Sequence, residues 1–133
     1  MDRQPTVMLV DDDPGMRLTV GRILENQGYR VLVAKGGPEA LYLAANDRFD
    51  VALVDYKMSG MNGGEVCAAL RRVNDGAALY IVTAHVNSET EEAALATGAN
   101  GILHKPVEVP RLLELVAEKA ALEKSASRSG SVS

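Results

Sequence analysis

Short apolar runs alternate with helical patterns along this chain of 133 residues, and no other feature of the sequence constrains its fold so strongly. The runs are continuously apolar and rich in β-branched residues, as in strands that are buried on both faces of a sheet. They predict strands over residues 6–10, 30–34, 51–55, 78–84 and 101–105. The segments after them predict helices over residues 14–28, 36–47, 64–73, 88–98 and 108–124.

Five strand–helix repeats without a β-hairpin turn signal predict an α/β fold, in which a doubly wound parallel sheet carries helices on both faces. The length fits a single domain, which we place at residues 1–124. The remaining segment, residues 125–133, reads "SASRSGSVS" and is small and polar. We therefore expect a disordered tail or a linker to an effector domain there.

Composition narrows the classes of function. The net charge of −4 argues against direct nucleic acid binding by this domain. No apolar run approaches the roughly 20 residues of a membrane span, and the start carries no apolar secretion segment. The single cysteine, Cys67, excludes an internal disulfide and suits a buried core position. These features together predict a cytoplasmic protein that binds neither membrane nor nucleic acid.

Chemistry-bearing residues stand where the predicted strands end. The first strand is followed by three carboxylates in a row, Asp11, Asp12 and Asp13, and the third ends in Asp55. Thr83 lies near the end of the fourth strand and Lys105 at the end of the fifth. Because ligands of open parallel sheets sit beyond the carboxyl ends of the strands, we expect these side chains to converge.

Clustered carboxylates repel one another unless a cation neutralises them or some are protonated. Mg²⁺ suits such oxygen ligands and takes one or two carboxylates directly. Asp55 stands apart on the central strand, where it can serve both as a metal ligand and as a nucleophile that forms an aspartyl-phosphate. Lys105 and the Thr83 hydroxyl would then share the phosphoryl oxygens.

The chain resembles the receiver domains of response regulators, the phosphoacceptor half of two-component signalling. Five motifs appear in the order of that family over residues 6–122: "LVDDDP", "ALVDYKMSGMNG", "IVTA", "GA" at 98–99 and "HKP". The resemblance implies a flavodoxin-like fold with strand order 2-1-3-4-5. It also implies a cis peptide bond between Lys105 and Pro106, and a switch rather than a metabolic enzyme.

The resemblance further implies the site roles. Asp12 binds Mg²⁺ directly, Asp11 binds it mostly through water, and the Lys57 main-chain carbonyl is a further protein ligand besides Asp55. Asp55 is phosphorylated by a histidine kinase or phosphotransfer protein. Output passes to an effector through the fourth helix, fifth strand and fifth helix, which could also form a homodimer. Opposite charges on that face are Glu89, Glu91, Glu92, Arg111 and Lys119.

Two positions depart from the family pattern. Ile102 replaces the usual Tyr or Phe three residues before the lysine, and Ser59 replaces the usual proline of the loop. The phosphorylation set is intact, so the departure at Ile102 concerns only the aromatic part of the switch.

For several residues a plain structural role competes with a functional one. Asp13 can be a solvated acid beside the two ligands, and His85 and Lys57 can be solvated loop residues that flank the pocket. His104 suits an exposed strand edge better than a metal site. Arg71 and Arg72 suit a solvated helix end, where they face the negative pole of the helix.

Two other functions fit parts of the pattern. "DDD" contains the Asp-x-Asp of phosphohydrolases with an aspartate nucleophile, but those enzymes need a cap domain, for which this chain has no residues to spare. A flavodoxin-like flavin or nucleotide binder needs a glycine- or hydroxyl-rich phosphate loop after the first strand. Here that loop is acidic and would repel phosphate.

Overall fold

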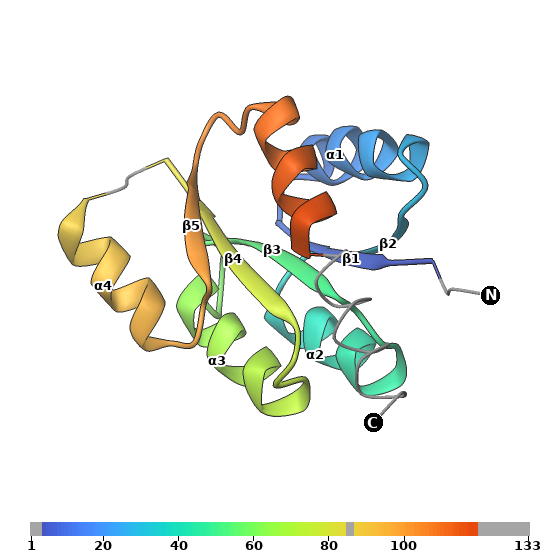
Figure 1. The fold of residues 1–133 in the computed structure, drawn as a ribbon. Coiled ribbons are helices and arrows are strands. Elements are labelled where there is room, and N and C mark those ends of the chain that lie inside the picture. Colours follow the sequence, from blue (N-terminus) through green and yellow to red (C-terminus); the bar gives the residue numbers. More distant parts are fainter. Residues whose placement is uncertain (1–3, 85–86, 120–133) are drawn as a thin grey trace, which may run out of the picture.

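The computed structural model describes residues 4–84 and 87–119. All five predicted strands pair in parallel in one sheet with the order β2-β1-β3-β4-β5, which confirms the predicted fold class (Figure 1). The Lys105–Pro106 peptide bond is cis, as the resemblance implied. The strands are β1 (Thr6–Val10), β2 (Arg30–Ala34), β3 (Val51–Asp55), β4 (Ala78–Thr83) and β5 (Gly101–His104).

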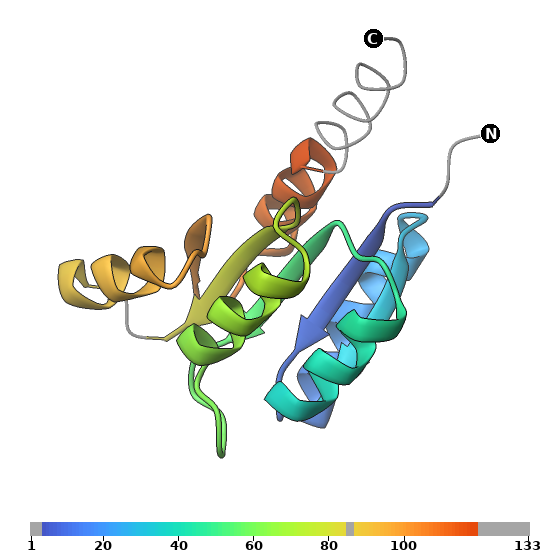
Figure 2. The same ribbon diagram turned by 90° about the horizontal axis from the view of Figure 1, so that it is seen from below.

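Helices cover both faces of the sheet. The helices are α1 (Pro14–Asn26), α2 (Gly37–Asn46), α3 (Gly63–Val73), α4 (Ser88–Ala96) and a C-terminal helix that includes residues 109–119. The C-terminal helix and α1 lie on one face, and α2 and α3 lie on the other, as Figures 1 and 2 show. In the part of the chain that is described, no helix has both the length and the apolar character needed to cross a bilayer.

The alternation of side chains along each strand divides the core into two clusters. In β1, Val7 and Leu9 pack with α1 and the C-terminal helix, whereas Met8 and Val10 pack with α2 and α3. Cys67 lies fully buried in the cluster beneath α2 and α3, as predicted, and burial raises the pKa of its thiol to about 12. Both clusters end at the strand termini, so the polar residues beyond them meet at one edge of the sheet.

Side-chain caps fix the starts of α1 and α3, the helices that follow β1 and β3. Asp13 is the N-cap of α1: its carboxylate accepts a hydrogen bond from the Gly15 amide, and Pro14 occupies the first helical position. Asn62 and Glu65 form a reciprocal capping box at the start of α3. The exposed Asp13 therefore has a structural use that sequence inspection did not assign to it.

For Arg71, the prediction of a solvated helix end is wrong. Its guanidinium is partly buried and donates to the carbonyl oxygens of Gly98 (2.7 Å from Nη2) and Ala77, and to the side chain of Asn100 (2.8 Å). It thus joins the end of α3 to the start of β4 and to the turn before β5. Arg72 is exposed, as predicted.

Some predictions fall on residues outside the described part of the chain. These are the loop residue His85, the end of the last helix up to residue 124, and the tail or linker at residues 125–133.

Candidate functional site

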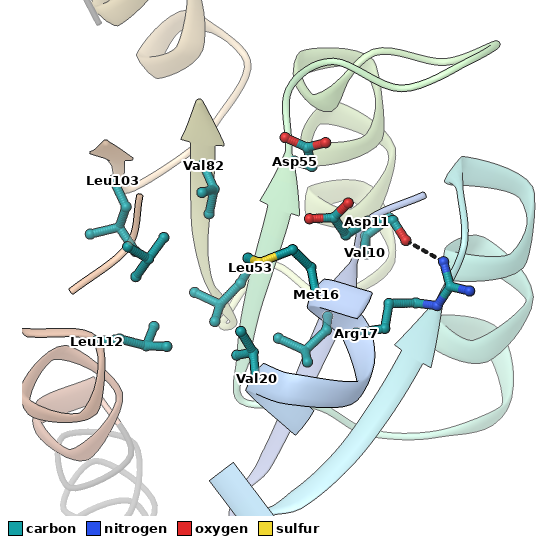
Figure 3. A pocket seen from close by; sticks show the side chains of 12 residues that line it. Val10, Asp11, Met16, Arg17, Val20, Leu53, Asp55, Val82, Leu103 and Leu112 are labelled. Carbon is teal, nitrogen blue, oxygen red and sulfur yellow. Dashed lines mark hydrogen bonds between the residues drawn. The ribbon is translucent and has the colours of Figure 1, made fainter. Parts of the chain in front are cut away.

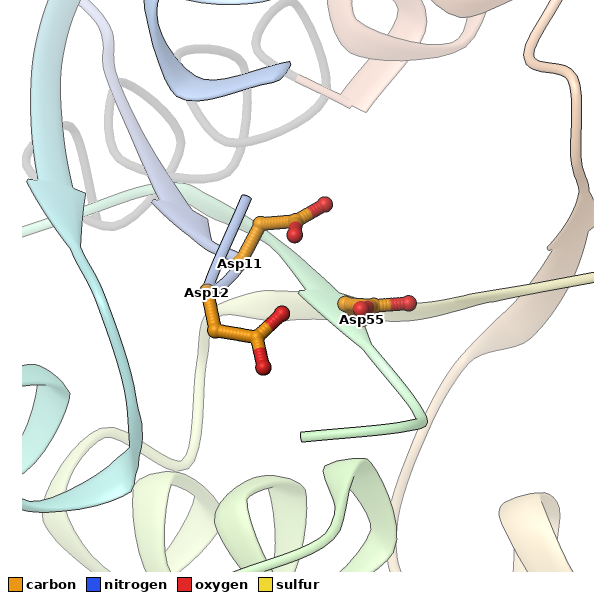
Figure 4. Close-up of side chains that lie close together, drawn as sticks. All are labelled: Asp11, Asp12 and Asp55. Carbon is orange, nitrogen blue, oxygen red and sulfur yellow. The ribbon is translucent and has the colours of Figure 1, made fainter. Parts of the chain in front are cut away.

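Three carboxylates converge where β1 and β3 end, as Figure 4 shows. The two strands are neighbours with Val10 in register with Val54, so Asp11 and Asp55 follow equivalent points of adjacent strands. Asp11, Asp12 and Asp55 each offer a carboxylate oxygen, and these oxygens lie within 4.8 Å of one another. The structure thereby brings together the three carboxylates that the family resemblance implied as metal ligands.

Asp55 is the most enclosed acid of the three. It continues the row of Val51 and Leu53 on the face of α1 and the C-terminal helix, and only 7% of its surface is exposed. Burial raises the pKa of Asp55, the hydrogen bond from Lys105 opposes that rise, and the negative charge of Asp11 adds to it.

A small apolar cavity of about 30 Å³ lies beside Asp55 and Asp11 (Figure 3). Apolar side chains from α1, from all strands but β2, and from the C-terminal helix and the segment before it form most of its wall, so little water can solvate the inner side of the carboxylates. The apolar lining residues are Leu9, Val10, Met16, Val20, Leu53, Val82, Leu103, Val107 and Leu112.

Lys105 is the cation of the site. Its Nζ lies 2.9 Å from Asp55 Oδ1 and 3.7 Å from Asp11 Oδ2. Burial disfavours its charge, but the hydrogen bond to Asp55 and the negative charge of Asp11 outweigh burial and raise the pKa of Lys105. The ammonium therefore stays charged while it faces the carboxylates.

The backbone joins this lysine to Thr83. The Lys105 amide donates to the Thr83 carbonyl oxygen at 2.8 Å, so the ends of β4 and β5 are fixed together. Thr83 itself is 7% exposed at the end of β4, the strand next to that of Asp55. Both residues predicted for phosphoryl contact thus lie at the same edge of the sheet as Asp55.

Hydrogen bonds to the backbone of Asp11 and Asp13 hold the acidic turn after β1 in place. The Asp11 amide donates to the Ala34 carbonyl oxygen, Asp11 Oδ1 accepts from the Asp13 amide at 2.9 Å, and Arg17 donates to the Asp11 carbonyl oxygen at 2.7 Å. With the turn held in this way, Asp12 is exposed to solvent and its carboxylate lies in the acidic cluster. The Asp13 carboxylate instead accepts its hydrogen bond at the start of α1. Sequence inspection missed Arg17, because its contact depends on the direction that its side chain takes from the first turn of α1.

The segment 56–62 carries Lys57, which is exposed, and connects β3 to α3. Two hydrogen bonds close its base: the Tyr56 amide donates to the Val82 carbonyl oxygen and the Gly63 amide donates to the Tyr56 carbonyl oxygen, both at 2.9 Å. The predicted metal ligand, the Lys57 carbonyl, lies just after the first of these anchors.

Residues 7–117 match the family model of the response regulator receiver domain. The chain belongs to this family. A response regulator receiver protein of Anaeromyxobacter sp. (strain Fw109-5) is 43% identical over 108 residues, which are 81% of this chain and 45% of that protein. The transcriptional regulatory protein GlrR of Escherichia coli (strain K12) is 34% identical over 127 residues, which are 95% of this chain and 28% of GlrR. The chain thus spans less than half the length of these relatives.

Solved receiver structures share the fold. A CheY-like receiver domain protein from Methanospirillum hungatei JF-1 has a TM-score of 0.88 at 30% identity, covering 93% of this chain and 99% of its own. The chemotaxis protein CheY4 of Vibrio cholerae has a TM-score of 0.83 at 32% identity, covering 87% of this chain and 98% of its own. Receiver domains are signalling switches of two-component systems, and the phosphoacceptor role follows from membership of the family.

Proposed function

We propose that Asp55 accepts a phosphoryl group from a histidine kinase or phosphotransfer protein in an Mg²⁺-dependent reaction. The observation that carries this is the position of Asp55: it is the carboxylate nearest to the Lys105 ammonium, at 2.9 Å, and it faces the acidic pair Asp11 and Asp12. A nucleophile, a cation and a second acidic group at one sheet edge are the parts that phosphoryl transfer to a carboxylate requires.

In the reaction, an Asp55 carboxylate oxygen forms a bond to phosphorus as the bond from phosphorus to the donor imidazole nitrogen breaks. The imidazole leaves with the electron pair of that bond. Lys105 exchanges its contact with Asp55 for one with a phosphoryl oxygen and so offsets the charge that arrives. The Thr83 hydroxyl donates to a second phosphoryl oxygen.

The residues fit the metal that the family binds. Asp11, Asp12 and Asp55 supply hard oxygen ligands, and Asp12 is exposed, so an ion with several waters can be held there. The Lys57 main-chain carbonyl is the proposed further ligand. When bound, Mg²⁺ neutralises charge on the carboxylates and on the phosphoryl oxygens.

Intact mass after incubation with acetyl phosphate tests the proposal. We expect a gain of one phosphoryl group in the presence of Mg²⁺, no gain in excess EDTA, and no gain for Asp55→Asn. Labelling of Asp55→Asn equal to that of the wild type would contradict the assignment. The acetyl phosphate consumed in the same incubation addresses the alternative of an aspartate-nucleophile phosphohydrolase. A switch retains one phosphoryl group per chain, whereas a phosphohydrolase consumes acetyl phosphate through many turnovers.

The proposed output surface consists of α4, β5 and the C-terminal helix. Glu89, Glu91 and Glu92 are exposed on α4. On the C-terminal helix, Arg111 is exposed and its Nη1 lies 4.0 Å from Oε2 of Glu114 on the same helix. Lys119 of this helix is partly buried. Light scattering with and without beryllofluoride and Mg²⁺ tests whether this face forms a homodimer. A doubled mass with both additions supports the dimer, and an unchanged mass at high concentration contradicts it.

A further inference from the structure

The side chain of Met61 connects the segment 56–62 to a helix that contributes no residue to the acidic cluster. Met61 is partly buried and packs against the core cluster beneath α2 and α3. Its side chain reaches the first turn of α2 at Gly37, and α2 and α3 lie side by side on this face (Figure 2). The segment that carries Lys57 is therefore in contact with α2.

This contact exists because residue 37 has no side chain. A Cβ atom at Gly37 would lie 2.5 Å from Met61 Sδ, 3.0 Å from its Cβ and 3.2 Å from its Cγ. The sulfur could move by a rotation within the side chain, but the Met61 Cβ is bonded to the backbone. Any residue larger than glycine at position 37 therefore requires the Met61 side chain to rotate and its Cβ to shift by a few tenths of an ångström, together with the backbone to which it is bonded.

The segment has little freedom to absorb such a displacement elsewhere. Its base is closed by the two hydrogen bonds of Tyr56, and its end is fixed by the capping box at Asn62. Gly63 packs so closely that an added Cβ would lie 2.7 Å from the Asp55 carbonyl oxygen. A shift of Met61 is thus transmitted to the stretch between Tyr56 and Met61, which includes the Lys57 carbonyl.

We propose that Gly37 is a positioning residue for the metal-dependent phosphorylation: by leaving space for Met61 at the first turn of α2, it holds the segment 56–62 where the Lys57 carbonyl meets the metal. The inference rests on the proposed function, since it assigns a purpose to the geometry of the metal site. It predicts that a residue on α2, outside the acidic cluster, sets the affinity for Mg²⁺.

Calorimetric titration with Mg²⁺ of Gly37→Ala, Met61→Ala and the double variant tests this. Each single variant should bind Mg²⁺ about 10-fold more weakly, the usual loss when the support of a metal ligand is removed. The double variant should bind about as weakly as Met61→Ala, because loss of the Met61 Sδ and Cγ removes the contacts at 2.5 and 3.2 Å and leaves the added methyl group only the Cβ of residue 61, at 3.0 Å. Initial rates of phosphorylation by acetyl phosphate at low Mg²⁺ should fall in parallel.

Two controls separate positioning from general loss of stability. Gly21→Ala adds a methyl group on α1, 3.8 Å from its nearest neighbours on β1 and β2, and should leave the Mg²⁺ affinity unchanged. Val116→Ala should lower the melting temperature, since Val116 is fully buried on the opposite face of the sheet, and should also leave the affinity unchanged.

An affinity of folded Gly37→Ala within about twofold of the wild type would overturn the inference, on the tenfold scale expected for such supports. If Gly37→Ala does not fold, Met61→Ala decides, because it introduces no clash, and wild-type affinity in that variant overturns the inference equally. If the wild type binds Mg²⁺ and is phosphorylated, and both single variants have the same Mg²⁺ affinity as the wild type, only the role of Gly37 is refuted. If the wild type neither binds Mg²⁺ nor is phosphorylated, the proposed function is refuted as well.

Discussion

At the scale of single residues, Asp55 is held in a form that is unfavourable for stability. Burial raises the pKa of Asp55 even though Lys105 lies beside it. An acid whose pKa is higher in the folded than in the unfolded chain stabilises the fold while it is protonated. That contribution is present below the ordinary pKa of 3.8 and is lost as the pH rises through the raised value. At neutral pH the ionised Asp55 therefore lowers the free energy of unfolding.

Asp55→Asn should accordingly melt at a higher temperature than the wild type at pH 7 in EDTA, because the amide cannot ionise. The advantage should narrow as the pH falls toward 3.8, where the wild-type carboxyl becomes protonated. Melting curves by circular dichroism between these pH values check the prediction. A lower melting temperature of Asp55→Asn at pH 7 would show that its ion pair with Lys105 outweighs its burial.

The adjacent acids Asp12 and Asp13 form a matched pair of substitutions. Asp12→Ala removes an exposed carboxylate from the cluster and should weaken Mg²⁺ binding and block phosphorylation, with an unchanged or higher melting temperature in EDTA. Asp13→Ala removes the N-cap of α1 and should lower the free energy of unfolding by about 1 kcal/mol while Mg²⁺ still binds. Urea unfolding and calorimetric titration of both variants separate the two roles. Reversed results would exchange the assignments.

At the scale of helices and strands, much of the fold could be predicted, because the spacing of apolar residues and the positions of proline and glycine indicate the same boundaries. Pro14 and Gly28 bracket α1, and the predicted strands match the observed ones to within a residue at each end. What could not be predicted are contacts between elements far apart in sequence. Arg71 reaches Gly98 only because the fold places the end of α3 beside the turn that precedes β5, and nothing local distinguishes Arg71 from Arg72.

The candidate site shows the same division. The rule that polar residues gather beyond parallel strands was sufficient to select Asp11, Asp55, Thr83 and Lys105. The separate uses of Asp12 and Asp13 depend on side-chain directions that their adjacent positions do not reveal. The contact between Gly37 and Met61 has no signal in one sequence, because the space that a missing side chain leaves is visible only in three dimensions.

Two glycines test how closely the elements pack. Gly21 lies inside α1, where an added methyl group has room, so Gly21→Ala should raise the free energy of unfolding by about 0.5–1 kcal/mol through helix propensity. Gly63 begins α3 against the backbone after β3, where a methyl group would lie 2.7 Å from the Asp55 carbonyl oxygen and the Tyr56 Cα, so Gly63→Ala should destabilise. Urea unfolding measures both. Equal effects at the two positions would contradict the packing described here.

At the scale of the whole molecule, the question is how a change at Asp55 reaches the proposed output surface. The Lys105 amide joins Thr83 to the end of β5, and Arg71 fixes the turn before β5 to α3. Both ends of β5 are therefore anchored, one beside Asp55 and the other at the opposite edge of the sheet. Between them lies Ile102, which is partly buried against the core and in register with Ile81 of β4.

This arrangement predicts a switch that changes mainly in its loops. A β-branched side chain has few rotamers and no ring to exchange between core and solvent, and Ile102 is already packed against the core. Addition of beryllofluoride and Mg²⁺ should therefore shift the amide resonances of Thr83, Ala84 and the segment 56–62 strongly, and that of Ile102 only modestly. The variant Ile102→Phe serves as the control, because a ring at this position can adopt a second rotamer, so the shift at residue 102 should grow. A shift at Ile102 as large as that at Thr83 in the wild type would show that this side chain moves with the phosphoryl group after all.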